Sequence, residues 1–340
     1  MVKLLKWVIG VILLLLVIYF LGPSAPKAEL TTTLPELKGN LLQIESDINK
    51  SEGALPNLKP DNQARIIWFD SLRKEKTPVS IVYLHGFSAS QGEGMPVHID
   101  FAKRYGCNLY LSRLYEHGLE SKEAFIDMTP EKLLQSAKEA VAVGKQIGDK
   151  VILMSTSTGG TLSLFIASGN PDLYGLICYS PNIDLYDSKS FILTSPWGLQ
   201  LSRMVLGSDY YNFSGPPGTL KYWITHYRIE GLIALKSLLN ASIKKEVFEQ
   251  VKMPVFVGYY YKDEQHQDDV VSIPAMLSMF DELGTPKEQK KKVCFPEAGT
   301  HPIASEIWSH DIMNVERQTF RFAEEILKLK PVFTDSLSVR

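Results

Sequence analysis

Short apolar runs alternate with amphipathic segments along most of the chain after about residue 60. The runs are short and rich in β-branched residues, so we expect strands at Ala64–Phe69, Val79–Leu84, Asn108–Ser112, Val151–Met154, Leu176–Tyr179, Val255–Tyr260 and Lys292–Phe295. Helix-like segments separate most of them, including Gly94–Tyr105. Another helix is expected from an N-cap at Thr129, through Pro130 in its first turn, to about Ile147. This alternation predicts an α/β fold with a mostly parallel sheet covered by helices on both faces.

The N-terminal segment follows a different pattern. No charged residue occurs from Trp7 to Leu21, and the apolar stretch Leu4–Leu21 covers 18 residues with Lys6 as its one charge. That length is just enough to cross a bilayer, and a lysine so near the end can extend to the surface. We therefore expect residues 4–21 to bind the membrane as a single-pass anchor.

The flanking residues bear on orientation and processing. Lys3 and Lys6 favour a cytoplasmic N-terminus, which would place the rest of the chain on the outer, periplasmic or extracytoplasmic, side. A cleaved signal peptide is the alternative. Pro23 and Pro26 surround the only small-residue cleavage site, and this favours an uncleaved signal anchor.

Changes in composition divide the chain into five predicted parts. They are a transmembrane anchor (1–22), a stalk and docking segment (23–60), an α/β core in two pieces (61–183 and 251–330), an inserted cap (184–250) and a C-terminal tail (331–340). A helix is expected around Leu41–Ile48. A structureless loop as long as the insertion would be unusual, so we expect a helical cap over the strand ends. Its many aromatic residues would either fill the cap's own core or line a substrate site.

The segment Val151–Gly160 carries the clearest chemical signal. An apolar run stops at Ser157, small residues lie two positions away on each side (Ser155 and Gly159), and a buried helix follows. A strand, a tight turn bearing serine and a helix form a nucleophile elbow, whose strained turn requires small neighbours. Ser157 is therefore the predicted nucleophile. The alternative is an ordinary strand-to-helix turn with an incidental serine.

A serine nucleophile needs a base and an orienting acid. His301 is the best base candidate, because it lies in a glycine-bearing loop after the last strand and before the last helix. A capping or core histidine is the alternative. By position after the strand Val255–Tyr260, the acid could be any of four residues: Asp263, Glu264, Asp268 or Asp269.

The oxyanion of the reaction needs hydrogen-bond donors. His85-Gly86-Phe87 closes the strand Val79–Leu84, so the backbone N–H groups of Phe87 and Thr158 could converge on the substrate oxygen. We expect His85 to hold this loop by a hydrogen bond rather than to act as a base. The ring of Phe87 could be a core aromatic, but the prediction concerns only its amide.

Four motifs in this order resemble the capped α/β-hydrolases of the serine esterase and monoacylglycerol lipase type. The motifs are His85-Gly86-Phe87, Ser155–Gly160, Asp268–Val271 and Gly299-Thr300-His301, and the resemblance covers roughly Ile66 to Leu329. It implies an α/β-hydrolase fold with a cap, and a cofactor-free serine hydrolase that acts through an acyl-enzyme. It also favours Asp268 as the acid, through the Asp-x-Val-Val run, with Asp263 as the alternative. One departure is Ser155, which replaces the usual glycine.

Composition excludes several other function classes. Charge is nearly balanced, with 36 basic and 38 acidic residues and a net charge of −2, and no basic patch suggests nucleic acid. The chain has no metal-binding motif and no phosphate-binding loop, so we expect neither a metal nor another cofactor. Three widely spaced cysteines are expected to be buried free thiols (Cys107, Cys178 and Cys294).

The sequence thus predicts a membrane-anchored serine hydrolase that cleaves carboxylic esters of lipid or acyl-chain type. Peptide or amide hydrolysis on the same fold is the first alternative. That reaction would favour carboxylates in the cap that bind a free amine, and Asp184, Asp187, Asp209 and Glu230 are available. The second alternative is a non-catalytic binding protein with a hydrolase fold. The substrate-binding residues are not singled out by the sequence.

Overall fold

A seven-stranded sheet forms the centre of the molecule. The computed structural model describes residues 2–332, so part of the predicted C-terminal tail, residues 333–340, lies outside the described residues. The strands are β1 (Arg65–Ile67), β2 (Thr77–Leu84), β3 (Asn108–Leu111), β4 (Gly148–Thr156), β5 (Gly175–Tyr179), β8 (Val255–Tyr259) and β11 (Lys290–Cys294). Their order in the sheet is β1-β3-β2-β4-β5-β8-β11. Only β1 pairs antiparallel, so the predicted mostly parallel sheet is confirmed.

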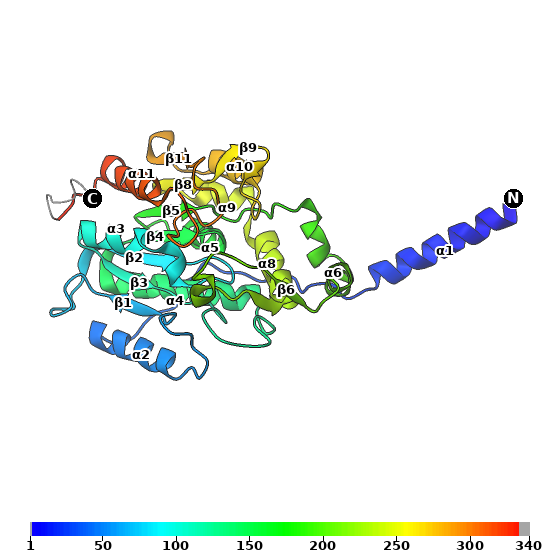
Figure 1. Cartoon of the computed structure of the whole chain (residues 1–340), viewed down its shortest axis with the longest axis horizontal. Coiled ribbons are helices and arrows are strands. Elements are labelled where there is room, and N and C mark those ends of the chain that lie inside the picture. Colours follow the sequence, from blue (N-terminus) through cyan, green and yellow to red (C-terminus); the bar gives the residue numbers. More distant parts are fainter. Residues whose placement is uncertain (1, 333–340) are drawn as a thin grey trace.

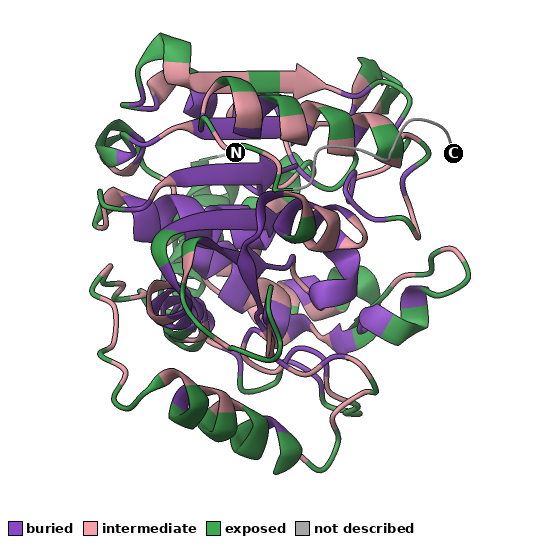
Figure 2. Cartoon of the chain, turned by 90° about the vertical axis from the view of Figure 1, so that its left-hand side faces the viewer, coloured by how far each residue is buried: buried purple, intermediate pink, exposed green. Residues whose placement is uncertain are grey.

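Helices cover both faces of this sheet. On one face, buried side chains of α4 (Pro130–Ile147), α5 (Thr158–Ser168), α9 (Lys245–Gln250) and α10 (Ile273–Glu282) form one core with the sheet. On the other face, α3 (Val97–Tyr105) and α11 (Ile312–Glu325) close a second core. Neighbouring residues of β4 enter opposite cores, Leu153 the first and Met154 the second. Because both faces are buried there, residues 151–154 of β4 are all apolar. Figure 2 shows the inner strands of the sheet as buried.

Local signals set the limits of several elements. Thr129 caps α4 as expected, since its side chain accepts a hydrogen bond from the Lys132 N–H at 3.3 Å. The strand β4 begins earlier than the expected Val151, because Gly148 already pairs with Thr77 of β2. Its apolar signal starts later because residues 149 and 150 are exposed.

The N-terminal part consists of a projecting helix and a segment that follows the domain. The helix α1 (Val2–Phe20) is exposed along its whole length and projects from the body (Figure 1). The chain after it packs on the domain, where Asn170 Nδ2 donates to Thr32 O at 3.0 Å. Asn40 then caps α2 (Leu41–Gly53), which is longer than the expected Leu41–Ile48. The stalk is therefore bound to the domain over much of its length.

The inserted segment contains both helices and strands. It comprises the 3₁₀ helix η2 (Ser188–Thr194), α6 (Gly198–Leu206), β6 (Tyr210–Asn212), α7 (Thr219–Tyr222), β7 (His226–Arg228) and α8 (Ile229–Ser242). The insertion contains helices, as expected, and also a short hairpin that the sequence did not predict, because β6 and β7 pair antiparallel with Tyr211 opposite Tyr227. The aromatic residues of this hairpin favour a strand, while the Gly-Pro-Pro-Gly segment at 215–218 turns the chain between them.

The three cysteines are free, but only two of them are buried. Cys107 and Cys178 lie in the core, whereas Cys294 is half-buried. The expectation that all three are buried is therefore wrong for Cys294. It belongs to β11, an edge strand of the sheet, and an edge strand is covered less than a central one.

A buried ion pair fastens α2 to the domain. Glu52 accepts hydrogen bonds from Arg113 Nε at 2.7 Å, from Arg113 Nη2 at 2.9 Å and from Ala64 N at 2.9 Å. We expect Glu52→Ala to lower the free energy of unfolding by about 3 kcal/mol, because it leaves the Arg113 charge buried without a partner. Urea unfolding of the full chain in detergent measures this change. The exposed Asp47→Ala on the same helix is the control and should change stability by less than about 0.5 kcal/mol.

Candidate active site

Ser157 occupies a strained turn between β4 and α5. Its φ of 54° and ψ of −118° lie in a region that non-glycine residues rarely adopt. Two backbone hydrogen bonds hold the turn: Ser157 N donates to Tyr179 O, and Asn182 N donates to Ser157 O, each at 3.0 Å. Such an enforced turn is the geometry of a nucleophile elbow.

Small neighbours make this turn possible. A Cβ atom on Gly159 would lie 2.0 Å from Leu84 O, so only glycine fits there. Ser155, at the position that is usually glycine in a nucleophile elbow, is fully buried, and its hydroxyl lies 3.5 Å from Ile177 O and 3.7 Å from Cys178 Sγ. The extra hydroxymethyl group is therefore accommodated, and the strained turn still forms.

His301 and Asp268 meet in a short hydrogen bond. His301 Nδ1 lies 2.6 Å from Asp268 Oδ2, although 33 residues separate them in sequence. Asp268 is fully buried, and its other oxygen accepts from the N–H groups of Val270 and Val271 at 3.0 Å each. The buried carboxylate is thus paired and hydrogen-bonded on both oxygens, as a buried charge requires.

Asp263, the alternative acid, lies elsewhere. It belongs to the hairpin of β9 (Tyr261–Asp263) and β10 (His266–Gln267), where its carboxylate pairs with His266 at 2.8 Å. The side chains of both residues are exposed. The structure therefore brings Asp268, and not Asp263, to His301.

The imidazole of His301 is prepared to hold a proton. Desolvation lowers its pKa, but the charge and hydrogen bond of Asp268 outweigh this effect, and the net pKa lies above the usual value. Its other nitrogen, Nε2, is buried and has no hydrogen-bond partner among residues 2–332. The Ser157 hydroxyl is therefore not yet bonded to it, a looseness common in ligand-free sites.

Backbone donors lie on two sides of Ser157. Thr158 is the first residue of α5, so its N–H is one of the four at the N-terminus that have no partner within the helix. Phe87 follows β2, and its ring packs against Phe125 and Tyr227. Its ring is thus part of an aromatic cluster, while its amide lies in the loop that passes Ser157.

His85 fixes this loop from behind. Its Nε2 accepts a hydrogen bond from Leu114 N at 3.0 Å, and its protonated Nδ1 donates to Gly86 O at 2.9 Å. Burial lowers its pKa to about 4, so the ring is neutral at pH 7. His117 holds Ser88, the residue after Phe87, in the same way, because its Nε2 accepts a hydrogen bond from Ser88 N at 3.0 Å. Both side chains hold the loop.

A buried carboxylate, Glu93, lies beside Ser157 and was not predicted from the sequence. Its Oε2 accepts from Gly86 N at 2.6 Å. A Cβ atom on Gly86 would lie 2.8 Å from Glu93 Oε1 and 3.1 Å from Ser157 Cβ, so Gly86 is wedged between the two side chains. Burial raises the pKa of Glu93 to about 7. In sequence, a single glutamate between Gly92 and Gly94 resembles an exposed turn, which explains why it was missed.

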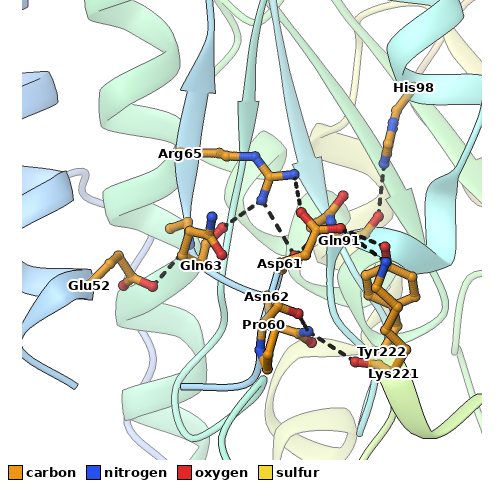
Figure 3. A network of polar contacts seen from close by, with 11 residues as sticks. Glu52, Pro60, Asp61, Asn62, Gln63, Arg65, Gln91, His98, Lys221 and Tyr222 are labelled. Carbon is orange, nitrogen blue, oxygen red and sulfur yellow. Dashed lines mark hydrogen bonds and ion pairs between the residues drawn. The ribbon is translucent and has the colours of Figure 1, made fainter. Parts of the chain in front are cut away.

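A polar network holds the 3₁₀ helix η1 (Gln91–Gly94), which carries Glu93 (Figure 3). Gln91 Nε2 donates to Asp61 O at 2.9 Å, and Gln91 O lies 2.8 Å from His98 Nε2. The Asp61 carboxylate pairs with Arg65 at 2.8 Å and accepts from Tyr222 Oη of the inserted segment at 2.6 Å. The network therefore joins η1, the start of the domain and the inserted segment at one point.

The candidate site residues all lie at the edge of the sheet where the carboxyl ends of its strands meet. Gly86 follows β2, Ser157 follows β4, Asp268 comes after β8 and its hairpin, and His301 comes after β11. These four strands are parallel, so their carboxyl ends meet at the same edge. Among the residues that the structure describes, no cluster of three histidine, cysteine or acidic side chains could hold a metal.

Comparison with solved structures identifies the fold. A metagenome-derived lipolytic enzyme structure from work on LipS and LipT superposes with a TM-score of 0.61 at 14% identity, over 78% of this chain and 98% of the other. The monoacylglycerol lipase of Paleococcus ferrophilus gives 0.57 at 14% identity, with the same two coverages. The chain has the α/β-hydrolase fold.

Sequence comparison gives a narrower match. The chain is 28% identical over 140 residues to a thermostable monoacylglycerol lipase of Bacillus sp. (strain H-257). The match covers 41% of this chain and 54% of the lipase, so the chain spans about half the length of this curated relative. No family model matches the chain.

The charge of Glu93 should be visible in the pH profile of an activity that uses neutral His301. The Glu93 carboxylate contributes to the raised pKa of His301, so Glu93→Gln should lower that pKa. We expect the acidic limb of kcat/KM to move to lower pH, while the amide oxygen can still accept from Gly86 N. Asp263→Asn is the control and should leave the limb in place. An unchanged limb in Glu93→Gln would show that Glu93 carries no charge over the pH range in which His301 titrates.

Proposed function

We propose that the protein is a membrane-anchored serine hydrolase that cleaves carboxylic esters of lipid or acyl-chain type through Ser157, His301 and Asp268. The observation that carries this proposal is the buried Asp268–His301 pair, whose free Nε2 lies at the same sheet edge as the strained Ser157 turn. This combination of an enforced turn, a paired imidazole and a buried acid is what nucleophilic catalysis by serine requires. The names of the lipases similar to this chain agree with an ester substrate.

In the proposed acylation, Ser157 Oγ attacks the ester carbonyl carbon while His301 Nε2 accepts the hydroxyl proton. Asp268 holds the Nδ1–H tautomer and stabilises the imidazolium that forms. The carbonyl oxygen becomes an alkoxide, which the N–H groups of Phe87 and Thr158 stabilise; each donor contributes about 10²- to 10³-fold in rate. The tetrahedral intermediate collapses, His301 returns the proton to the leaving alcohol, and an acyl-enzyme remains.

Deacylation repeats these steps with water. His301 takes a proton from the water molecule whose oxygen attacks the acyl carbon, and the same two amides stabilise the second alkoxide. Collapse of this intermediate breaks the bond to Ser157 Oγ, which recovers its proton from His301. The carboxylic acid leaves, and the enzyme returns to its initial state without any cofactor.

The pairing of charges in the inserted segment favours an ester over a peptide as the substrate. An aminopeptidase-like reaction needs free carboxylates for the substrate amine. Asp184 instead pairs with Lys236 at 2.6 Å, and Glu230 pairs with Arg203 and Arg228 at 2.7 and 3.0 Å. Asp209 pairs with Arg203 at 2.9 Å, while the Asp187 side chain accepts from the Lys189 N–H. These four carboxylates thus have partners within the protein.

The N-terminal helix supports the membrane location that we propose. Over 19 residues α1 is long and apolar enough to cross a membrane, and none of it is buried within the protein. An exposed helix of this composition gains more from lipid than from water, which supports an anchor. With the cytoplasmic N-terminus inferred from Lys3 and Lys6, the hydrolase domain would lie on the outer side.

An activity-based probe tests the nucleophile. A fluorophosphonate should label the wild-type chain and should not label Ser157→Ala, because an activated serine oxygen bonds to the phosphorus of the probe and displaces fluoride. Gel fluorescence of the full chain in detergent measures the labelling. Equal labelling of Ser157→Ala would remove Ser157 from its proposed role, and absence of labelling in both would contradict the serine hydrolase itself.

Substitution of the acids tests the rest of the triad. Asp268→Asn should lower kcat on a short-chain nitrophenyl ester by roughly 10³- to 10⁴-fold, because the amide no longer holds the reactive tautomer of His301. Asp263→Asn, the matched control, should retain activity within about twofold. The reverse result would assign the acid to Asp263. Activity on neither nitrophenyl esters nor monoacylglycerols would contradict the esterase proposal.

A further inference from the structure

The last turn of the helix α6 presents its apolar side chains outward. Its buried residues are small, Gly198 and Ser202, whereas Met204 and Val205 are 72% and 74% exposed. Leu206 and the nearby Phe191 of η2 are exposed as well. A helix on the surface of a soluble domain normally has the opposite arrangement, with its apolar stripe toward the core. We call Phe191, Met204, Val205 and Leu206 the cap patch.

The helix that carries most of the cap patch begins next to the end of the N-terminal helix. Trp197, the residue before α6, donates its backbone N–H to Pro23 O at 2.7 Å and its indole Nε1–H to Ile18 O at 3.1 Å. Figure 1 shows α6 beside the point where α1 joins the body. The start of α6 is therefore fixed to the C-terminal end of α1, the proposed membrane anchor.

The one charged side chain of α6 is paired with acidic residues of the inserted segment. Arg203, within α6, pairs with Asp209 at 2.9 Å and with Glu230 at 2.7 Å, so its guanidinium is neutralised. The patch itself carries no charged residue. An apolar, uncharged surface beside a membrane helix matches the environment at the boundary between lipid head groups and acyl chains. A tryptophan at that depth is common, because its ring is apolar and its N–H can hydrogen-bond.

We propose that the cap patch is a second membrane contact, inserted into the outer lipid interface beside α1. The inference rests on the proposed anchoring by α1 and extends it, because it assigns the domain a fixed orientation with α6 and η2 toward the bilayer. Its partner is the lipid interface itself. A second copy of the chain bound through the same patch is the competing outcome.

The stalk supports a fixed orientation. Besides the Asn170–Thr32 hydrogen bond, Glu29 N donates to the Glu131 carboxylate at 3.0 Å, so the segment after α1 is bound to the domain. A cavity of about 360 Å³ lies between this segment and the cap, with Pro23, Leu193 and Leu199 among its lining residues. An amphiphilic ester in the bilayer would thus meet the cap without crossing bulk water.

Depth-dependent quenching tests the contact directly. Full-length protein, with Cys294→Ser as background, is reconstituted in phosphatidylcholine vesicles and labelled with a nitrobenzoxadiazole fluorophore at Met204→Cys or at Val205→Cys. Lipids carrying a nitroxide near the head group should quench these labels about threefold more than a label at Leu72→Cys, a matched control that is 95% exposed and distant in sequence from the patch. A label at Trp7→Cys reports insertion of α1 in the same preparation.

The four labelled positions together distinguish the possible outcomes. Quenching at Trp7, Met204 and Val205 but not at Leu72 supports the second contact. Quenching at Trp7 alone overturns the cap patch proposal and leaves the anchor in place, whereas no quenching at any position overturns both. If the labels on α6 are shielded from water but unquenched, and the shielding grows with protein density, the patch binds a second copy and the proposal fails.

The contact should also affect turnover of substrate in the membrane. We expect Met204→Asp combined with Val205→Asp to lower the ratio of monoacylglycerol hydrolysis in vesicles to soluble nitrophenyl ester hydrolysis by about five- to tenfold, because charges oppose insertion. Leu72→Asp should leave this ratio unchanged. An unchanged ratio in the double variant would contradict a role of the patch in reaching substrate, independently of whether the triad assignment is correct.

Discussion

The short hydrogen bond between His301 Nδ1 and Asp268 Oδ2 is the interaction on which the proposed chemistry depends. A carboxylate that is fully buried carries a large desolvation penalty unless it is paired and hydrogen-bonded. Here two backbone N–H groups and one imidazole meet that requirement. The same bond selects the tautomer of His301, raises its pKa and leaves Nε2 without a partner, which is the state needed in a general base.

The sheet makes this bond possible. Parallel strands bring their carboxyl ends to one edge, so residues that are more than a hundred positions apart can share a site. The strained turn of Ser157 and the loop at Gly86 are fixed at that edge by backbone hydrogen bonds and by the buried rings of His85 and His117. Rigid elements therefore position the reactive groups.

Sequence patterns with a strict local cause were sufficient for most of the fold. Buried parallel strands must be apolar on both faces, and a nucleophile elbow must have small neighbours, so the strands and the Ser157 turn could be found from the sequence. Features that depend on tertiary contact could not be found from the sequence. Glu93 becomes special only because folding buries it against Gly86, and the hairpin of β6 and β7 depends on pairing across an interval of 13 residues. The outward face of α6 likewise has meaning only beside α1.

The most direct test of the central claim is a crystal structure of the fluorophosphonate adduct. We predict that phosphorus is bonded to Ser157 Oγ and that its phosphoryl oxygen lies about 3 Å from the backbone nitrogens of both Phe87 and Thr158, with His301 still bonded to Asp268. An adduct on another residue would contradict the account. So would a phosphoryl oxygen turned away from both amides, because the site would then lack the donors that the mechanism requires.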